Sequence, residues 1–309
     1  MFRIGFCGSG HFAELCLRQL AAGCEIAWVI TNPPKASGRG LQLRKTPVNE
    51  AAEELGISCY TTDRLSADTE RIEWLKKDCA DLIFVIDFGQ MIKEPVLSLP
   101  KYGCINLHPS KLPAYRGSAP LQRCIIDGLS LTAVSIFRLD EGMVSGNLLA
   151  QPEVEITDGE TYETLLEKCA KIGCKEMLRL LEAGAENWNF TPQSREGVSL
   201  APKIEKSEGK INWAKSAFEC SCLIRALANA PGVFCFYGGK RLRLFKAEIV
   251  NTGKNAEAGT IIAVEKGYPI ISCGQNALKL EIVQPDGKRK QSASDWLRGA
   301  RLNIGDRLE

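Results

Sequence analysis

The chain has 309 residues, 45% of them hydrophobic, and a formal net charge of +2. This length and hydrophobic content are sufficient for two domains with buried cores and argue against a disordered chain. A charge so close to zero excludes a globally basic nucleic-acid-binding protein, so any contact with nucleic acid must come from local patches.

Cysteine usage indicates a reducing compartment. The thirteen cysteines are odd in number, scattered, and contain no Cys-x-x-Cys pair, which predicts free thiols in the cytosol. Neither histidine is close in sequence to Cys220 and Cys222, the closest pair, so we expect no metal site. The first residues do not form a signal peptide and no stretch is long enough to span a bilayer, so we expect a soluble cytoplasmic protein without membrane contact.

The N-terminal segment predicts a strand over residues 2–7, a turn, a helix over 11–22 and a second strand over 26–30. Gly8-x-Gly10-x-x-Ala13 fits a dinucleotide fingerprint at the turn. Because no acidic residue follows the second strand to hold a ribose, we favour a tight turn in a doubly wound sheet over a nicotinamide site. His11, which begins the helix, is interpreted as a surface or capping residue.

A basic loop follows the second strand. Residues 33–46 show no apolar period and carry four candidate polyanion-binding side chains, Lys35, Arg39, Arg44 and Lys45. The segment is either an exposed connection or a flap that neutralises phosphates.

Strands and helices then alternate, which predicts a parallel sheet. We expect helices over residues 48–55, 68–77 and 91–99, and strands over 57–60, 81–86 and 103–107. Ligands in open α/β sheets bind beyond the carboxyl ends of the strands, so the loops after Ile86 and Leu107 should line one crevice.

The stretch from Cys104 to Gln151 contains the most concentrated polar signal. Strand alternation places Asn106 and His108 on one side, where an amide and an imidazole could stabilise an oxyanion. The alternative is a strand end at which Asn106 caps backbone groups and His108 is satisfied locally. A helix over 121–127, a strand over 132–139 and a helix over 161–181 complete the first domain.

The remaining sequence predicts a second domain. Residues 182–203 lose periodicity, and a helix of about fifteen residues is expected to open at 211–217. Short strands over 232–236, 241–249, 259–264, 269–273 and 278–285 predict a small β-barrel, OB-like, of a kind that binds nucleic acid. Basic residues gather there: Lys240, Arg241, Arg243, Lys246, Lys288, Arg289 and Lys290.

The long pattern Asn106-x-His108-Pro-Ser-x-Leu-Pro-x-Tyr-Arg-Gly resembles that of the folate-dependent formyltransferases. The segments 37–40, 116–123, 210–213 and 284–289 are similar to members of the family that act on methionyl-tRNA. The resemblance implies formyl transfer from 10-formyltetrahydrofolate to the α-amine of initiator methionyl-tRNA, without a metal. It also implies a Rossmann-like, mostly parallel α/β formyltransferase domain over 1–183, a linker over 184–203 and a tRNA-contacting barrel over 204–309.

The resemblance further implies roles for individual residues. Asn106 and His108 correspond to catalytic residues, and the basic loop corresponds to the segment that contacts tRNA. The folate-binding residues would be Phe88, Gly89, Gln90, Met91, Ile92, Ser110, Lys111, Leu112 and Pro113. We expect a monomer.

One expected catalytic residue is missing. The family's third catalytic group is an Asp, and Val144 occupies its position. A valine cannot orient or charge-stabilise a histidine, whereas Asp87, Asp140 or Glu141 could provide a substitute carboxylate. Val144 favours one alternative, an impaired paralogue that binds folate or tRNA. A second alternative, which would share the folate site, is an N-formyltransferase for amino-sugar nucleotides.

Overall fold

The structure, a computed structural model, describes residues 2–37, 42–253 and 256–309. The chain divides into two compact units. The first comprises residues 1–120, 131–155 and 163–202, and the second comprises residues 121–130, 156–162 and 203–309. Residues 184–202, in the predicted linker, therefore pack with the first unit. The division at 184–203 remains a prediction of the sequence.

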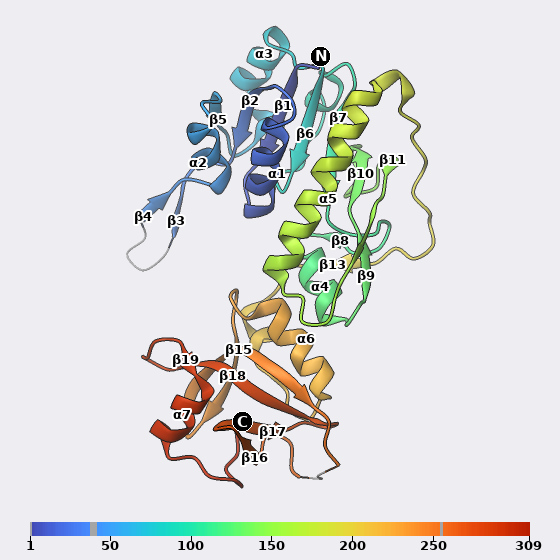
Figure 1. Cartoon of the computed structure of the whole chain (residues 1–309). Helices are drawn as coiled ribbons and strands as arrows, with labels where there is room; N and C mark the ends of the chain where they lie inside the picture. Colours follow the sequence, from blue (N-terminus) through green and yellow to red (C-terminus); the bar gives the residue numbers. More distant parts are fainter. Residues whose placement is uncertain (1, 38–41, 254–255) are drawn as a thin grey trace. The chain divides into compact units, whose positions relative to one another are not determined.

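A seven-stranded sheet forms the centre of the first unit, in the order β11-β10-β7-β6-β1-β2-β5 (Figure 1). The five strands from β5 to β7 are mutually parallel, whereas β10 and β11 run antiparallel at one edge. The strands are β1 Ile4–Gly8, β2 Ile26–Thr31, β5 Cys59–Thr61, β6 Leu82–Ile86, β7 Cys104–His108, β10 Ser135–Arg138 and β11 Leu148–Ala150. The predicted mostly parallel sheet is confirmed.

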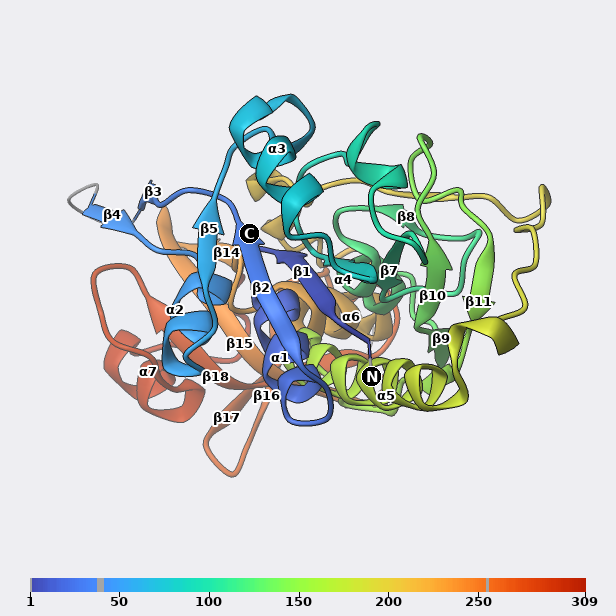
Figure 2. The same cartoon turned by 90° about the horizontal axis from the view of Figure 1, so that it is seen from above.

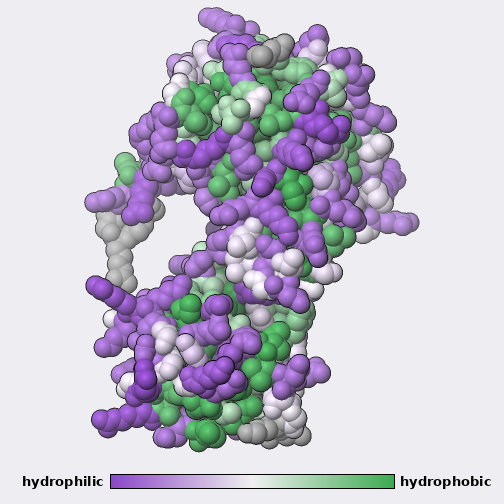
Figure 3. Space-filling model, viewed as in Figure 1, coloured by the Kyte–Doolittle hydropathy of each residue, from purple (hydrophilic) through white to green (hydrophobic). Residues whose placement is uncertain are grey.

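Helices cover both faces of this sheet, with α1, α2 and α5 on one side and α3 on the other (Figure 2). Their bounds are α1 His11–Ala21, α2 Pro47–Glu54, α3 Thr69–Lys77 and α5 Tyr162–Ala183. Buried residues explain this arrangement: Ile72 and Leu75 of α3 join a core cluster with Trp28 and Val85. Hydrophilic residues cover most of the face drawn in Figure 3.

Short elements complete the first unit. The parallel pair β8 Arg116–Gly117 and β13 Leu200–Ala201 joins distant segments, and β9 Leu131–Ala133 pairs with β12 Glu153–Glu155. The 3₁₀ turns are η1 Leu65–Ala67, η2 Val96–Ser98 and η3 Ala185–Asn187. The predicted basic loop is a hairpin of β3 Lys35–Ser37 and β4 Gln42–Arg44. The predicted site residue Arg39 lies outside the described residues.

The second unit is built on an antiparallel sheet in the order β14-β15-β18-β17-β16. Its strands are β14 Val233–Tyr237, β15 Lys240–Val250, β16 Ile261–Glu265, β17 Tyr268–Ser272, β18 Ala277–Pro285 and β19 Gln291–Ser292. The helical elements are α4 Pro120–Ile126, η4 Lys206–Gly209, α6 Ala217–Leu227 and α7 Ala293–Ala300. Helix α7 was not predicted.

The C-terminal residues close this sheet into a barrel. Glu309 and Phe236 exchange two backbone hydrogen bonds of 2.8 Å, which attach the tail to the edge strand β14. Gly305 N donates to Ile261 O over 2.9 Å, and Leu308 N donates to Gly259 O over 2.9 Å, which attaches the same tail beside β16 at the opposite edge. The predicted barrel is thus completed by a segment that carries no strand pattern.

Three predicted elements are wrong in their bounds. Residues 91–99 contain only η2, because Pro95 cannot donate a helical hydrogen bond. The predicted strand 132–139 is divided into β9 and β10, which pair with different partners. The helix expected from residue 211 begins at Ala217, because the Ser216 side chain accepts from Glu219 N over 3.2 Å and caps it there.

Candidate active site

Asn106 and His108 lie at the carboxyl end of β7. The register pairs Val85 of β6 with Asn106 and Ser135 of β10 with His108, so both polar residues lie at the edge where open α/β sheets bind ligands. Leu107, between them, faces α5: a side chain added at Gly173 would meet it at 2.7 Å. Strand alternation therefore directs Asn106 and His108 to the opposite face.

Only part of the hydrogen-bonding capacity of the Asn106 amide is used within the protein. Its Nδ2 donates to Val85 O over 2.7 Å, which fixes the orientation of the side chain. Its Oδ1 is buried and has no hydrogen-bond partner in the described part of the chain. Buried polar atoms without partners are unusual, so Oδ1 is an acceptor available to the N–H of a bound molecule.

His108 is held in a defined tautomer. Its Nε2 lies 3.1 Å from Tyr115 O, and because a carbonyl oxygen can only accept, Nε2 carries the hydrogen and the neutral ring keeps the Nδ1 lone pair. The residue is 8% exposed. Burial lowers the pKa of His108 to about 4, against the opposing effect of the bond to Tyr115. At neutral pH the ring is therefore uncharged, and Nδ1 accepts protons rather than donating them.

Val144 lies in the loop between β10 and β11, in a left-handed conformation with φ 56°. This conformation is unfavourable for a β-branched residue. Two side chains hold the loop. Asp140 accepts from Ser145 Oγ over 2.9 Å, and Gln193 donates to the carbonyls of Val144 and Gly146 over 3.0 and 2.8 Å. Asp140 thus acts within its own loop.

Sequence reasoning missed the support of this loop by a distant segment. Gln193, which bonds the Val144 loop, also accepts from Arg116 Nη2 over 2.6 Å. Arg116 itself lies on β8, which pairs with β13. No periodic pattern could have revealed this link, because residues 116 and 193 are far apart in sequence and outside the main sheet.

Asp87 follows β6 and also has a left-handed backbone, with φ 43°. Its carbonyl accepts from Ser9 N and Gly10 N over 3.1 and 3.2 Å. Its carboxylate lies against Gly10, with Oδ2 1.8 Å from the point that a Cβ there would occupy. Desolvation of the carboxylate raises the pKa of Asp87 to about 6, whereas His11 and the Phe12 N–H act to lower it. Other parts of the residue are exposed to solvent.

The position of Asp87 bears on the glycine-rich turn. Helix N-termini bind anions, and a dinucleotide would place its pyrophosphate at the start of α1. The Asp87 carboxylate already lies against Gly10 at that position. The geometry therefore agrees with the interpretation of Gly8 to Ala13 as a tight turn.

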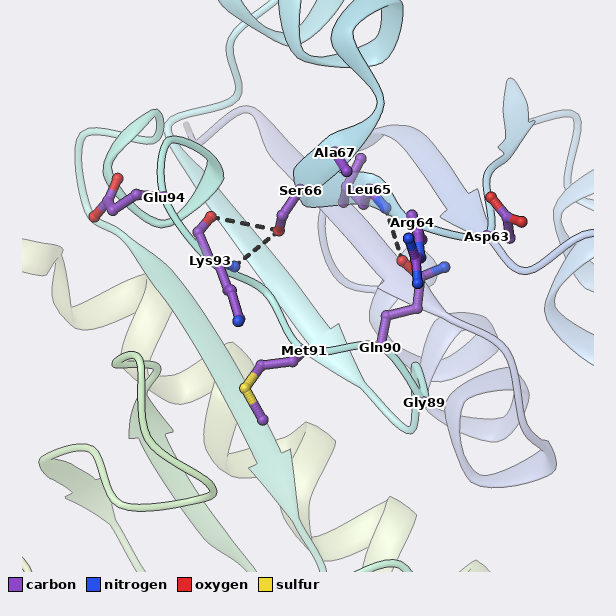
Figure 4. A pocket seen from close by; sticks show the side chains of 10 residues that line it. All are labelled: Asp63, Arg64, Leu65, Ser66, Ala67, Gly89, Gln90, Met91, Lys93 and Glu94. Carbon is purple, nitrogen blue, oxygen red and sulfur yellow. Dashed lines mark hydrogen bonds between the residues drawn. The ribbon is translucent and has the colours of Figure 1, made fainter.

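The predicted folate loop has two kinds of residue. Phe88 and Ile92 are buried in the core, at 2% and 4% exposure. Gln90 links this loop to two other segments of the chain. Its Oε1 accepts from Leu65 N over 2.8 Å, and its Nε2 donates to Asn32 Oδ1 over 2.7 Å. Gly89, Gln90 and Met91 line a pocket of about 390 Å³ (Figure 4).

The opposite wall of this pocket comes from the η1 region. The Lys93 N–H donates to Ser66 Oγ over 2.8 Å, which ties the two walls together. Figure 4 shows the pocket's other lining side chains, Asp63, Arg64, Leu65, Ala67 and Glu94. The pocket therefore combines two cations and two carboxylates with an apolar thioether.

The predicted folate-contacting turn after His108 is internally braced. Ser135 Oγ donates to Ser110 O over 2.6 Å, and Gln151 Nε2 donates to Leu112 O over 2.9 Å. Ser110 and Leu112 are buried, Pro113 is half-buried, and exposed Lys111 forms an ion pair of 2.7 Å with Glu153. These bonds fix the backbone of the turn that follows His108.

The predicted tRNA-contacting residues lie on the β3–β4 hairpin or next to it. Lys35 and Arg44 are directly opposite each other on the two strands and are exposed. Lys45 follows β4 and forms a 2.5 Å ion pair with Glu53 of α2. The hairpin therefore presents at least two cations side by side.

A face of the barrel, not recognised from the sequence, combines rings and cations. We call Phe234, Phe236, Arg241, Arg243, Phe245 and Lys290 the aromatic-basic face. The Arg241 guanidinium lies 3.7 Å from the centre of the Phe234 ring, and Lys290 Nζ lies 4.0 Å from that of Phe245. The alternation of residues in β14 and β15 could have indicated this face, but the prediction from the sequence used only the positive charges.

The described residues contain no group of three or more His, Cys, Asp or Glu side chains able to hold a metal ion. All thirteen cysteines are free thiols. Within the same described ranges, no helix is long and apolar enough to cross a membrane.

Comparison with known proteins identifies the family. Residues 3–181 match the formyl transferase family, and residues 203–301 match the C-terminal domain of formyl transferases. The chain belongs to the formyl transferase family. The resemblance seen around Asn106 and His108 is therefore confirmed.

Similar proteins of known name are consistent with this result. The methionyl-tRNA formyltransferases of Rickettsia massiliae and Rickettsia rickettsii are 36% and 37% identical over 300 residues, which cover 97% of this chain and 97% of each relative.

Solved structures show the same fold at lower identity. The methionyl-tRNA formyltransferase of Clostridium thermocellum has 17% identity and a TM-score of 0.58, covering 82% of this chain and 96% of its own. The N-formyltransferase of Helicobacter canadensis, in complex with folinic acid and dTDP-3-aminofucose, has 18% identity and a TM-score of 0.64 over 91% and 99%.

Proposed function

We propose that this chain transfers a formyl group from 10-formyltetrahydrofolate to the α-amine of initiator methionyl-tRNA, as a cytoplasmic monomer in translation initiation. The observation that carries the proposal is full-length similarity to methionyl-tRNA formyltransferases at 36–37% identity. The placement of Asn106 and His108 at the carboxyl edge of the sheet supports it.

In this proposal the acceptor amine attacks the formyl carbon, and the carbonyl electrons move to oxygen. The second N–H of Asn106 Nδ2 stabilises the oxyanion, while Oδ1 accepts from the attacking nitrogen. His108 Nδ1, held as an acceptor by the bond from Nε2 to Tyr115, takes the proton from the attacking nitrogen and passes it to N10 as the C–N10 bond breaks.

Different segments of the chain would hold the two substrates. The loop Phe88 to Ile92 and the braced turn Ser110 to Pro113 would hold the folate, with the 390 Å³ pocket beside Met91 receiving part of it. The β3–β4 hairpin, through Lys35 and Arg44 with Lys45 beside it, would contact the tRNA. Arg39 belongs to the same sequence motif.

The aromatic-basic face of the barrel would bind the same tRNA. Rings that alternate with guanidinium groups can stack on unpaired bases, while the cations neutralise the backbone. The Arg241 guanidinium over the Phe234 ring supports this role, because it places a cation and an aromatic ring next to each other on this face.

One observation favours a second candidate, a binding protein with little turnover. Val144 has no ionisable group, and loss of one member of a catalytic trio commonly costs orders of magnitude in rate. The fold and both binding surfaces would survive that loss. Val144 is thus the feature that separates the two functions.

The decisive experiment measures formyl transfer from 10-formyltetrahydrofolate to methionyl-tRNA by the unmodified chain, Val144→Asp and His108→Ala. The proposal expects transfer by the unmodified chain that His108→Ala abolishes. Transfer by Val144→Asp alone would establish the second candidate. Formylation of an amino-sugar nucleotide, without formylation of tRNA, would contradict both.

A further inference from the structure

The tautomer of His108 depends on a hydrogen bond to a turn with an unfavourable backbone. Nε2 lies 3.1 Å from the carbonyl oxygen of Tyr115, and Tyr115 is left-handed, with φ 57°. This conformation is unfavourable for a bulky residue and persists only where neighbouring contacts maintain it. The position of the hydrogen on His108 therefore depends on the contacts that hold residues 115 and 116.

A segment far along the chain holds this turn. Tyr115 N donates to Ser199 Oγ over 2.9 Å, and Arg116 N donates to Ser199 O over 2.9 Å. The same segment holds the Arg116 side chain, because its Nη2 donates to Gln193 Oε1 over 2.6 Å. The Nε of Arg116 is buried and has no hydrogen-bond partner within the described ranges, so the guanidinium depends on its bond to Gln193.

The Val144 loop fixes the orientation of the Gln193 amide. Nε2 donates to Val144 O and Gly146 O over 3.0 and 2.8 Å, which uses both hydrogens of that nitrogen and leaves Oε1 directed to Arg116. An amide suits this place because it donates and accepts at once, whereas a carboxylate cannot donate and an ammonium cannot accept. The loop that lacks the expected acid therefore still anchors a side chain that reaches the turn beside His108.

We propose that Gln193 is a positioning residue for formyl transfer and that it acts through the turn that holds His108. The inference rests on the proposed function. While Gln193 holds Arg116, the carbonyl of Tyr115 stays within reach of Nε2 and the hydrogen stays on that nitrogen. Nδ1 then remains the acceptor that the proposed proton transfer needs. Gln193 itself transfers no proton.

A purely structural role for Gln193 makes a different prediction. If its bonds only stabilise the fold, their loss makes the chain easier to unfold and leaves the folded active site unchanged. Two substitutions separate the roles. Gln193→Ala removes every bond of the amide, whereas Gln193→Glu keeps an acceptor for Arg116, in a charge-assisted bond, and loses the bonds to the Val144 loop.

The first measurement reads the tautomer of His108 directly. The chain has two histidines, so a long-range proton–nitrogen correlation spectrum of protein with isotope-labelled histidine resolves both rings. We expect the Nε2–H tautomer for His108 in the unmodified chain and in Gln193→Glu, and a large shift towards the Nδ1–H tautomer in Gln193→Ala. The ring of His11, whose Nδ1 lies 2.9 Å from the Glu14 carboxylate, should not change.

The second measurement compares kcat and KM for formyl transfer from 10-formyltetrahydrofolate to methionyl-tRNA. We expect Gln193→Ala to lower kcat about 30-fold and to leave both KM values within about threefold, because the substitution acts on proton transfer and not on substrate binding. Gln193→Glu should keep kcat within about fivefold of the unmodified chain. Asn187→Ala is the control: this nearby amide donates to Ala183 O over 2.5 Å, so its loss should leave kcat unchanged.

Removal of Arg116 tests the same contact from its other end. We expect Arg116→Met to change the tautomer of His108 as Gln193→Ala does. The double variant should lose little further kcat, because both substitutions break one contact. Arg116→Met also provides the test if Gln193→Ala does not fold.

Other outcomes decide against the inference. An unchanged kcat in Gln193→Ala would show that Gln193 positions nothing that the reaction needs. An unchanged His108 tautomer in that variant, or an equal shift in Gln193→Glu, would contradict action through Arg116. If the unmodified chain does not formylate methionyl-tRNA, the proposed function fails, whereas the spectrum still shows whether Gln193 fixes the ring.

Discussion

Val144 lacks an ionisable group and also adopts a backbone conformation that is unfavourable for valine. Asp and Asn tolerate φ near 56° far better than valine, which pays about 1 to 2 kcal/mol for this conformation. We predict that Val144→Asn raises the free energy of unfolding by about 1 kcal/mol, because it keeps the left-handed backbone without the β-branched clash. Urea unfolding followed by tryptophan fluorescence measures this change.

Val198 provides a matched control for that substitution. It is 47% exposed in a loop and lies outside the left-handed residues of the chain. Val198→Asn should change the free energy of unfolding by less than about 0.5 kcal/mol. A similar gain at both positions would mean that the effect comes from polarity and not from relieved strain.

His108 should make stability depend on pH. Its folded-state pKa of about 4 lies below its unfolded value near 6.5, so between these pH values only the unfolded chain binds the proton. Its contribution to stability is therefore complete above about pH 6.5 and is lost as pH falls to 4, by roughly 3 kcal/mol in total.

Replacement of the histidine tests this dependence. We predict that in His108→Gln the free energy of unfolding falls less between pH 7.5 and pH 5 than in the unmodified chain. His11→Gln is the natural control, because His11 is the only other histidine and its side chain is 61% exposed. Parallel slopes for His108→Gln and the unmodified chain would contradict a buried neutral ring.

At the scale of elements, periodicity identified the central strands of both units and helices α1, α2, α3 and α5 to within a few residues, but it began α6 too early and missed α7. It also placed Asn106 and His108 on one face of β7, because alternation along a strand depends only on local geometry. Alternation says which face a residue occupies but not which atom it meets. The bond from His108 to Tyr115 and the bonds from Gln193 to the Val144 loop depend on tertiary folding, so the sequence could not reveal them.

Closure of the barrel likewise depends on contacts that periodicity cannot predict. The tail that closes it has no strand period, yet Leu308 is 1% exposed. We predict that Leu308→Ala costs about 2 to 4 kcal/mol and speeds amide hydrogen exchange at Phe236 and Ile261, which donate to the tail. Ile304→Ala, at a position 65% exposed, should have little effect. Equal effects of the two substitutions would contradict closure by residues 305–309.

For the whole molecule, the small net charge limits how it can bind a polyanion. A charge of +2 over 309 residues gives little general attraction to RNA, so affinity must come from clustered cations. Two clusters are present, one in each unit: the β3–β4 hairpin and the aromatic-basic face. If both contact one tRNA, loss of either cluster must weaken the same complex.

We therefore predict that Lys35→Ala with Arg44→Ala, and separately Arg241→Ala with Lys290→Ala, each weaken methionyl-tRNA binding about tenfold at physiological salt. Each pair removes about two phosphate contacts, so the slope of log Kd against log salt should decrease by about two in each variant and by about four when the pairs are combined. Fluorescence anisotropy over a salt series measures both quantities. Arg179→Ala, which removes an exposed cation paired with Glu176 on α5, is the control and should leave the slope unchanged. A slope that responds to only one pair would mean that a single unit binds the tRNA, because counterions are released only where phosphates are neutralised.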